Sequence, residues 1–96
     1  MAGRRFPIDA ELSLGREHAD VVVDDPEVSR RHALLRWSAG RLELTDAGSA
    51  NGTFVNEERI SAPRELATGD VIRIGRTAMF VTVPQHDPGA TVLRPA

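Results

Sequence analysis

The chain has 96 residues, a formal net charge of −2 at pH 7 and no cysteine. This length fits one domain with a modest core, and the lack of cysteine excludes disulfides and thiolate metal sites and favours a cytoplasmic location. The sequence has no run of about 20 apolar residues that could span a bilayer, and its charge balance predicts neither nucleic acid nor a membrane as partner.

Short runs in which apolar and polar residues alternate dominate the sequence and predict half-buried β-strands. In chain order these runs cover residues 11–14, 21–23, 33–37, 41–45, 71–74 and 79–83. Turn-forming groups such as Asp24-Asp25-Pro26 separate them. Many short strands with frequent turns are typical of an all-β sandwich. We expect the domain to cover residues 1–83 and the proline-containing segment 84–96 to be a flexible C-terminal tail.

Three groups of residues lie at the breaks between these predicted strands. Gly15-Arg16 follows the first run, Ser29 precedes His32 by three residues, and Asn51-Gly52 comes further on. The order G-R, S-x-x-H and N-G resembles the pattern of the forkhead-associated (FHA) domain, a phosphothreonine-peptide reader, over roughly residues 5 to 83. The resemblance implies an FHA-like β-sandwich of two twisted, mostly antiparallel sheets, with the peptide bound by loops at one end.

The start of the chain departs from the family pattern. FHA domains usually have a first strand before a turn and a segment like Arg5-Phe6-Pro7-Ile8, and here the chain begins almost at that turn. We therefore expect the first strand to be missing or replaced, which would leave an open strand edge in one sheet. Residues 90–94 are one candidate to fill the gap. A second copy of the protein is the other candidate, and it would make a strand-mediated homo-oligomer.

The resemblance assigns the phosphate contacts to Arg16, Ser29 and Arg30. A phosphothreonine carries a charge of about −1.5 to −2 and three strong acceptor oxygens, so its reader needs fixed donors and a cation. Arg16 would supply the cation, Ser29 both its hydroxyl and its backbone N–H, and Arg30 a second guanidinium. Gly15 would let the backbone turn without a Cβ clash. Taken alone, each of these residues is ordinary loop sequence.

The same resemblance assigns roles to His32 and to Asn51-Gly52. His32 would be structural and would hold the loop of Ser29 in shape through bonds to nearby backbone. Asn51 would bind the backbone of the extended peptide through its amide, and Gly52 would adopt the positive φ of a tight turn. Taken alone, Asn51-Gly52 is also the strongest short signal of a plain β-hairpin. A Ser-His-Asp triad and a histidine metal site are other readings, but neither has the required motif or spacing.

Two further residues bear on specificity, and a third is a possible phosphorylation site. In some family members the position of Glu27 contacts the residue three places after the phosphothreonine, where a glutamate would favour a basic residue; the other reading is a solvated carboxylate. Ala50 stands where some members have a threonine that contacts the ligand, so affinity would be lower by roughly 1 kcal/mol. Thr91 lies in the predicted tail, three residues before Arg94. Phosphorylated Thr91 is therefore a hypothetical ligand of its own or a neighbour's site.

These features predict a non-catalytic module, with no cofactor and no metal, that binds phosphothreonine in partner proteins. We expect a cytoplasmic signalling adaptor downstream of Ser/Thr kinases, whose partner is a kinase or its substrate. All 12 basic residues are arginine, which favours a GC-rich bacterial source. The alternative is a structural protein–protein interaction module of the same fold that binds unphosphorylated partners or self-associates. An enzyme ranks third because no catalytic motif supports one.

Overall fold

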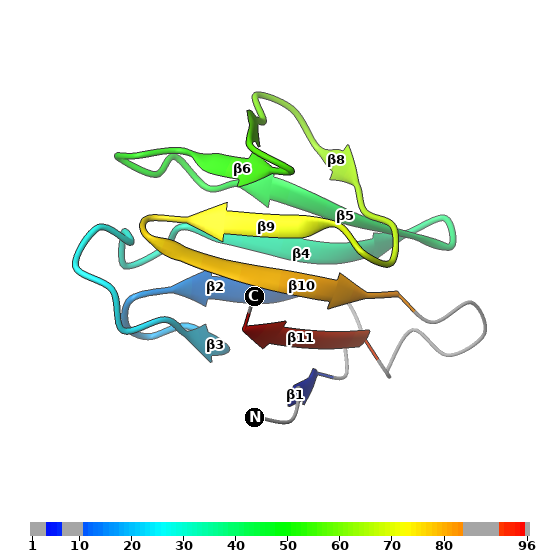
Figure 1. Cartoon of the computed structure of the whole chain (residues 1–96), viewed down its shortest axis with the longest axis horizontal. Coiled ribbons are helices and arrows are strands. Elements are labelled where there is room, and N and C mark those ends of the chain that lie inside the picture. The colour runs from blue at the N-terminus through cyan, green and yellow to red at the C-terminus, as the bar shows by residue number, and fades with distance from the viewer. Residues whose placement is uncertain (1–3, 7–10, 84–90, 96) are drawn as a thin grey trace.

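The structure is a computed structural model that describes residues 4–6, 11–83 and 91–95. These residues form two β-sheets that pack face to face, and no helix occurs among them (Figure 1). The described part of the chain consequently contains no helix that could cross a membrane. The all-β sandwich with mostly antiparallel sheets that the sequence predicts is confirmed.

Each sheet has its own set of strands. Sheet A has the order β1-β11-β10-β9-β6-β7 and contains β1 (Arg4–Phe6), β6 (Thr53–Val55), β7 (Glu58–Arg59), β9 (Val71–Ile74), β10 (Thr77–Thr82) and β11 (Thr91–Pro95). Sheet B has the order β3-β2-β4-β5-β8 and contains β2 (Glu11–Gly15), β3 (Val21–Val22), β4 (Ala33–Ser38), β5 (Arg41–Asp46) and β8 (Arg64–Glu65). Neighbouring strands in these ranges run antiparallel, apart from the parallel pair β2 and β3.

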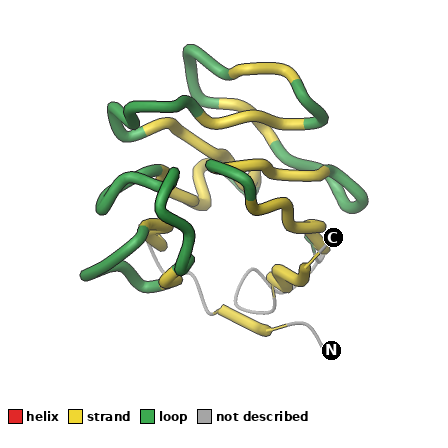
Figure 2. The backbone as a smooth tube through the Cα atoms, turned by 60° about the vertical axis from the view of Figure 1, so that its left-hand side comes forward, coloured by secondary structure: helices red, strands yellow, loops and turns green. Residues whose placement is uncertain are grey.

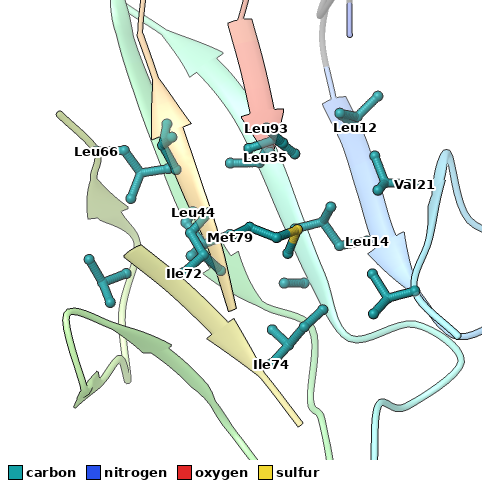
Figure 3. Close-up of a cluster of buried hydrophobic side chains, with 14 of the residues drawn as sticks. Leu12, Leu14, Val21, Leu35, Leu44, Leu66, Ile72, Ile74, Met79 and Leu93 are labelled. Atoms are coloured by element: carbon teal, nitrogen blue, oxygen red, sulfur yellow. The ribbon is translucent and has the colours of Figure 1, made fainter. Parts of the chain in front are cut away.

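The core lies between the two sheets and follows from the alternation of the strands. Leu35 and Leu44 of sheet B and Ile72 and Ile74 of sheet A are completely buried, and Figure 3 shows side chains from both sheets meeting in one cluster. Successive strand residues point to opposite faces, so each of these strands directs every second residue inward. Because removal of apolar surface from water drives folding, the predicted period-two runs become the inner faces of the sandwich.

The strands at the two ends of the chain correct two expectations. A first strand is present, but it is short: β1 lies at the edge of sheet A, with Arg5 opposite Val92. The segment 90–94, which the sequence offered as a replacement, overlaps β11, and β11 pairs with both β1 and β10. Leu93 is buried in the core, so residues 91–95 belong to the sandwich and not to a free tail. Residues 84–90 lie outside the described part of the chain.

The connections that carry the three motifs gather at one end of the sandwich. The β2–β3, β3–β4 and β5–β6 connections lie at the left in Figure 1, with the β9–β10 turn, and Figure 2 brings this end forward. Because β5 belongs to sheet B and β6 to sheet A, Asn51-Gly52 links the two sheets and is not a hairpin turn. A two-residue hairpin turn occurs instead at Ala39-Gly40, at the opposite end, where both φ angles are positive.

Candidate functional site

Hydrogen bonds join the three motif-bearing segments to one another. The backbone N–H of Arg16 donates to the carbonyl of Ser29 over 3.0 Å. The hydroxyl oxygen of Ser29 accepts the N–H of Ala50 at 3.0 Å, and the side-chain amide of Asn51 donates to the carbonyl of Glu27 at 2.8 Å. The structure therefore brings Arg16, Ser29 and Asn51, which are far apart in sequence, to one end of the molecule.

His32 forms a second link between the β3–β4 and β5–β6 loops. Its ring is completely buried; Nδ1 accepts the N–H of Ser29 at 3.0 Å, and Nε2 lies 2.8 Å from the carbonyl of Gly52. An N–H can only donate and a carbonyl can only accept, so the neutral ring carries its proton on Nε2. The ring of His32 thus bonds to the backbone of both loops and holds them together, as expected for a structural residue.

The donors left over at this junction suit an anion. The exposed guanidinium of Arg16 makes no hydrogen bond or ion pair within the described part of the chain. The hydroxyl oxygen of Ser29 is an acceptor for Ala50, which leaves its proton available for donation outward. The expectation that the Ser29 backbone N–H would also serve needs correction, because His32 Nδ1 already accepts it. The Arg16 guanidinium and the Ser29 hydroxyl proton therefore remain available to a ligand.

Comparison with known proteins identifies the family. A family model described as the FHA domain matches residues 12–75, about two thirds of the chain. The chain belongs to the FHA domain family. The resemblance read from the three motifs is confirmed, and so is the function of a phosphothreonine-dependent binding module at the level of the family.

Two curated relatives of this FHA domain are bacterial regulators. Glycogen accumulation regulator GarA of Mycolicibacterium smegmatis is 40% identical over 89 residues, which are 90% of this chain and 56% of GarA. Oxoglutarate dehydrogenase inhibitor of Corynebacterium glutamicum is 44% identical over 77 residues, which are 78% of this chain and 53% of that protein. The chain thus spans about half the length of these curated relatives.

Solved structures agree with the family. The FhaA FHA domain, complexed with the intracellular domain of Rv3910, is 32% identical with a TM-score of 0.68, covering 88% of this chain and 80% of that one. Mycobacterium tuberculosis EmbR, in complex with a low-affinity phosphopeptide, is 30% identical with a TM-score of 0.69, covering 91% of this chain and 20% of that one.

The β5–β6 loop of the FHA domain is stabilised by Asp46. Its carboxylate accepts the N–H groups of Gly48 and Ser49 at 3.0 Å each and the hydroxyls of Ser49 and Thr53 at 2.5 and 2.6 Å. Burial raises the pKa of Asp46, but the bonds from the Ser49 and Thr53 hydroxyls and from backbone N–H groups outweigh it and hold the pKa below its ordinary 3.8. The hydrogen bonds of loop residues to the Asp46 carboxylate therefore hold the loop that carries Asn51 in one conformation.

The β3–β4 loop is stabilised by Asp25, a buried carboxylate. It accepts the N–H of Glu27 at 2.9 Å, and it reaches the β9–β10 turn, where the N–H of Arg76 and the hydroxyl of Thr77 each donate at 2.8 Å. The bond from Glu27, followed by the one from Thr77, holds the pKa of Asp25 below its ordinary 3.8. This residue fastens the loop of Ser29 to the opposite sheet.

The two other charged site candidates, Arg30 and Glu27, are each paired with a neighbour. Arg30 Nε lies 3.2 Å from a carboxylate oxygen of Glu17, and both side chains are more than half exposed. Glu27 lies 3.4 Å from Arg76 Nε. Exposed pairs of this kind contribute little to stability, but they place a competing anion beside Arg30 and partly neutralise the carboxylate from which a preference for basic peptides was expected.

Gly15 supports the site for a different reason than the one expected. A Cβ at Gly15 would lie 1.9 Å from the carbonyl oxygen of Arg30, so the close approach of the β3–β4 loop requires glycine. Gly52 does adopt the expected positive φ, at 92°. In addition, a Cβ there would lie 2.8 Å from Nε of Arg59. Both glycines therefore make room for a neighbouring segment.

The remaining expectations concern Ala50 and Thr91. Ala50 is exposed and contributes its N–H to Ser29. Thr91 lies in β11, opposite Phe6 of β1, so docking of Thr91 into the site would require this strand to leave the sheet. No cluster of three or more His, Asp or Glu side chains that could hold a metal ion occurs among the described residues.

Sequence reasoning missed the residues that hold the loops in place. Asp46 and Ser49 carry a readable signal, because an aspartate followed by glycine and serine two and three residues later is typical of a side chain that bonds its own turn. For Asp25 only the bond from Glu27 is local; the bonds from Arg76 and Thr77, which follow it by about 50 residues, leave no signal in the sequence.

Proposed function

We propose that this FHA domain binds phosphothreonine-containing segments of partner proteins and catalyses no reaction on them. The observation that supports this best is the junction of Arg16, Ser29 and Asn51 on hydrogen-bonded loops, with an unpaired guanidinium and a hydroxyl proton left over. In this proposal Arg16 and the Ser29 hydroxyl bind the phosphate. Asn51, whose amide keeps one N–H and its oxygen beyond the bond to Glu27, binds the peptide backbone.

The affinity follows from few contacts on a rigid frame. Each charge-assisted hydrogen bond to the phosphate contributes about 1.5–3 kcal/mol. Because His32, Asp25 and Asp46 already fix the loops, ordering them at binding costs little entropy. Two or three such contacts with the peptide backbone bonds give a free energy of about −8 kcal/mol, which corresponds to micromolar affinity.

The names of the relatives support a regulatory role. The FhaA FHA domain was solved with the intracellular domain of Rv3910, and EmbR with a phosphopeptide; GarA is named a regulator and the corynebacterial relative an inhibitor. We infer that the partner of this domain is a Ser/Thr kinase or a protein that such a kinase phosphorylates, and that the encounter takes place in the cytoplasm.

The test is a comparison of Arg16→Ala with Arg41→Ala. Arg41 is also exposed, but it lies beside the β4–β5 turn at the opposite end of the sandwich (Figure 1). A degenerate phosphothreonine library supplies a peptide ligand, and calorimetry then measures its affinity. We expect Arg16→Ala to abolish measurable binding with little change in stability, and Arg41→Ala to bind like the parent.

Two results would contradict the proposal. If Arg16→Ala binds the phosphopeptide as well as the parent domain does, the site lies elsewhere. If a partner protein binds equally well before and after phosphatase treatment, the structural interaction module is the better description.

Phosphothreonine should also be preferred to phosphoserine, because one additional methyl group in a small pocket is worth about 1–3 kcal/mol.

A further inference from the structure

Arg59 lies against the loop that carries Asn51. It ends β7 opposite Phe54, and the N–H of the next residue, Ile60, donates to the carbonyl of Thr53 at 2.9 Å. A Cβ at Gly52 would lie 2.8 Å from Nε and 3.0 Å from Cζ of Arg59. The guanidinium therefore packs directly on the backbone of Gly52, the residue that follows Asn51.

The charge of Arg59 is not compensated by its acidic neighbours. Glu57 pairs with Arg73 at 2.8 Å, and Glu58 pairs with Arg64 at 3.1 Å. No hydrogen bond or ion pair within the described part of the chain engages the exposed side chain of Arg59. Of the three charged residues in this turn, the cation beside Gly52 is thus the one left for a ligand.

On its other side Asn51 is bonded to the β3–β4 segment that carries Glu27. Its amide bonds the carbonyl of Glu27, and the Glu27 carboxylate is paired with Arg76. A peptide bound by Asn51 would therefore meet a partly neutralised acid on one side and an unpaired arginine on the other. This asymmetry favours acidic over basic residues beside the phosphothreonine.

We propose that Arg59 is a further cation of the phosphopeptide site and binds the carboxylate of an aspartate or glutamate close to the phosphothreonine. This inference rests on the proposed function. The planar guanidinium matches a carboxylate in geometry and charge. Arg59 lies beside Gly52, the residue after Asn51, which binds the peptide backbone next to the phosphothreonine in this proposal. Because an extended peptide advances about 3.3 Å per residue, we place the acidic residue within three positions of the phosphothreonine. The ligand class is an acidic phosphothreonine peptide.

The experiment moves one aspartate through a phosphothreonine peptide whose other side chains are uncharged. Each seven-residue peptide has the phosphothreonine at its centre and a single Asp at one of the six flanking positions from −3 to +3, and each has an Asn-containing twin. Calorimetry measures every pair against the parent domain and against Arg59→Gln, Arg59→Lys and Arg41→Gln. The ratio of the affinities for the Asp and the Asn peptide isolates the effect of the carboxylate.

We expect one position at which Asp strengthens binding to the parent by about three- to tenfold. Arg59→Gln should bind the Asn peptide like the parent but lose the gain from Asp, whereas Arg59→Lys should keep part of it and Arg41→Gln all of it. A merely structural role of Arg59 would change both peptides alike, and the Lys variant provides a second test should the Gln variant unfold.

Two results overturn this inference alone. One is an Asp gain of the same size in Arg59→Gln and the parent, and the other is the absence of any Asp gain at all six flanking positions. If the parent binds no phosphothreonine peptide of any composition, the proposed function itself fails, and this inference fails with it.

Discussion

The β3–β4 and β5–β6 loops are stabilised in the same way, but the donors that stabilise them come from different distances along the chain. Each contains one carboxylate that accepts several N–H and hydroxyl donors. The donors of Asp46 all lie within residues 48–53, so the β5–β6 loop is held by its own residues. Asp25, in contrast, takes two of its donors from the turn between β9 and β10.

The difference shows how a binding loop can be fixed in two ways. A locally held loop keeps its shape as long as its own chain is intact. A loop held from another sheet keeps its shape only when the two sheets are packed against each other. Ser29 therefore depends on the tertiary structure more than Asn51 does, and the two loops respond differently to substitution.

The largest expected effect separates two glycines, one that ends β2 and packs against the β3–β4 loop and one within the β5–β6 loop. Gly15→Ala would place a Cβ 1.9 Å from the carbonyl oxygen of Arg30 and push the β3–β4 loop away. Gly48→Ala has no atom within 4 Å and bears only the strain of φ +84°. We expect losses in the free energy of unfolding of about 3 kcal/mol for Gly15→Ala and about 1 kcal/mol for Gly48→Ala, measured by urea unfolding. Equal losses would contradict the assignment of Gly15 to loop packing.

A smaller effect concerns pH. The pKa values of Asp25 and Asp46 lie below 3.8 in the folded domain, so the stability they contribute is present above the unfolded pKa and is lost as pH falls through the folded pKa. Asp46→Asn should lower the free energy of unfolding at pH 7 by about 1–2 kcal/mol, and Asp25→Asn should lower the urea midpoint further because it also releases the β9–β10 turn.

Urea unfolding from pH 7 to pH 2.5 checks this expectation. As pH falls toward the lowered folded-state pKa values, the two carboxylates of the parent become protonated, so the difference between the parent and the Asn variants should shrink toward the acidic end. A difference that stays constant over the whole range would mean that neither carboxylate acts through its charge.

The smallest expected effect concerns the ion pair of Glu17 with Arg30 of the β3–β4 loop and its influence on phosphopeptide affinity. The family resemblance assigns Arg30 to the phosphate, and Glu17, which is paired with Arg30, would compete for that guanidinium. Glu17→Gln should therefore raise phosphopeptide affinity by about two- to fivefold, the range of an exposed ion pair, as measured by calorimetry. In the Arg30→Gln background the same substitution should have no effect. If Glu17→Gln still raised the affinity in this background, Glu17 would not act by competing for Arg30.

The parts of the fold that depend on neighbouring residues could be predicted from the sequence. The alternation of Leu42 and Leu44, or of Ile72 and Ile74, indicates which face of each strand is buried, and the glycine between the runs at 33–37 and 41–45 is typical of a turn. The turn at Asn56-Glu57, where both residues have positive φ in the structure, was not predicted. Glutamate is not a residue that favours such a turn.

The parts of the site that depend on distant contacts could not be predicted. The motifs placed Arg16, Ser29 and Asn51 on the right loops, but the use of the Ser29 N–H by His32 and the ion pairs of Arg30 and Glu27 arise only when the loops meet. Arg59 gave no signal either, because its position over Gly52 follows from the register of β6 and β7.

The enclosed ring of His32 provides a spectroscopic reporter of loop assembly. Its proton on Nε2 faces the Gly52 carbonyl in a fully buried position, so exchange of this proton with solvent requires the two loops to separate. Nitrogen chemical shifts distinguish the two tautomers of a neutral imidazole. One resonance from one side chain therefore follows, without any ligand, whether the binding end of the domain is closed or open.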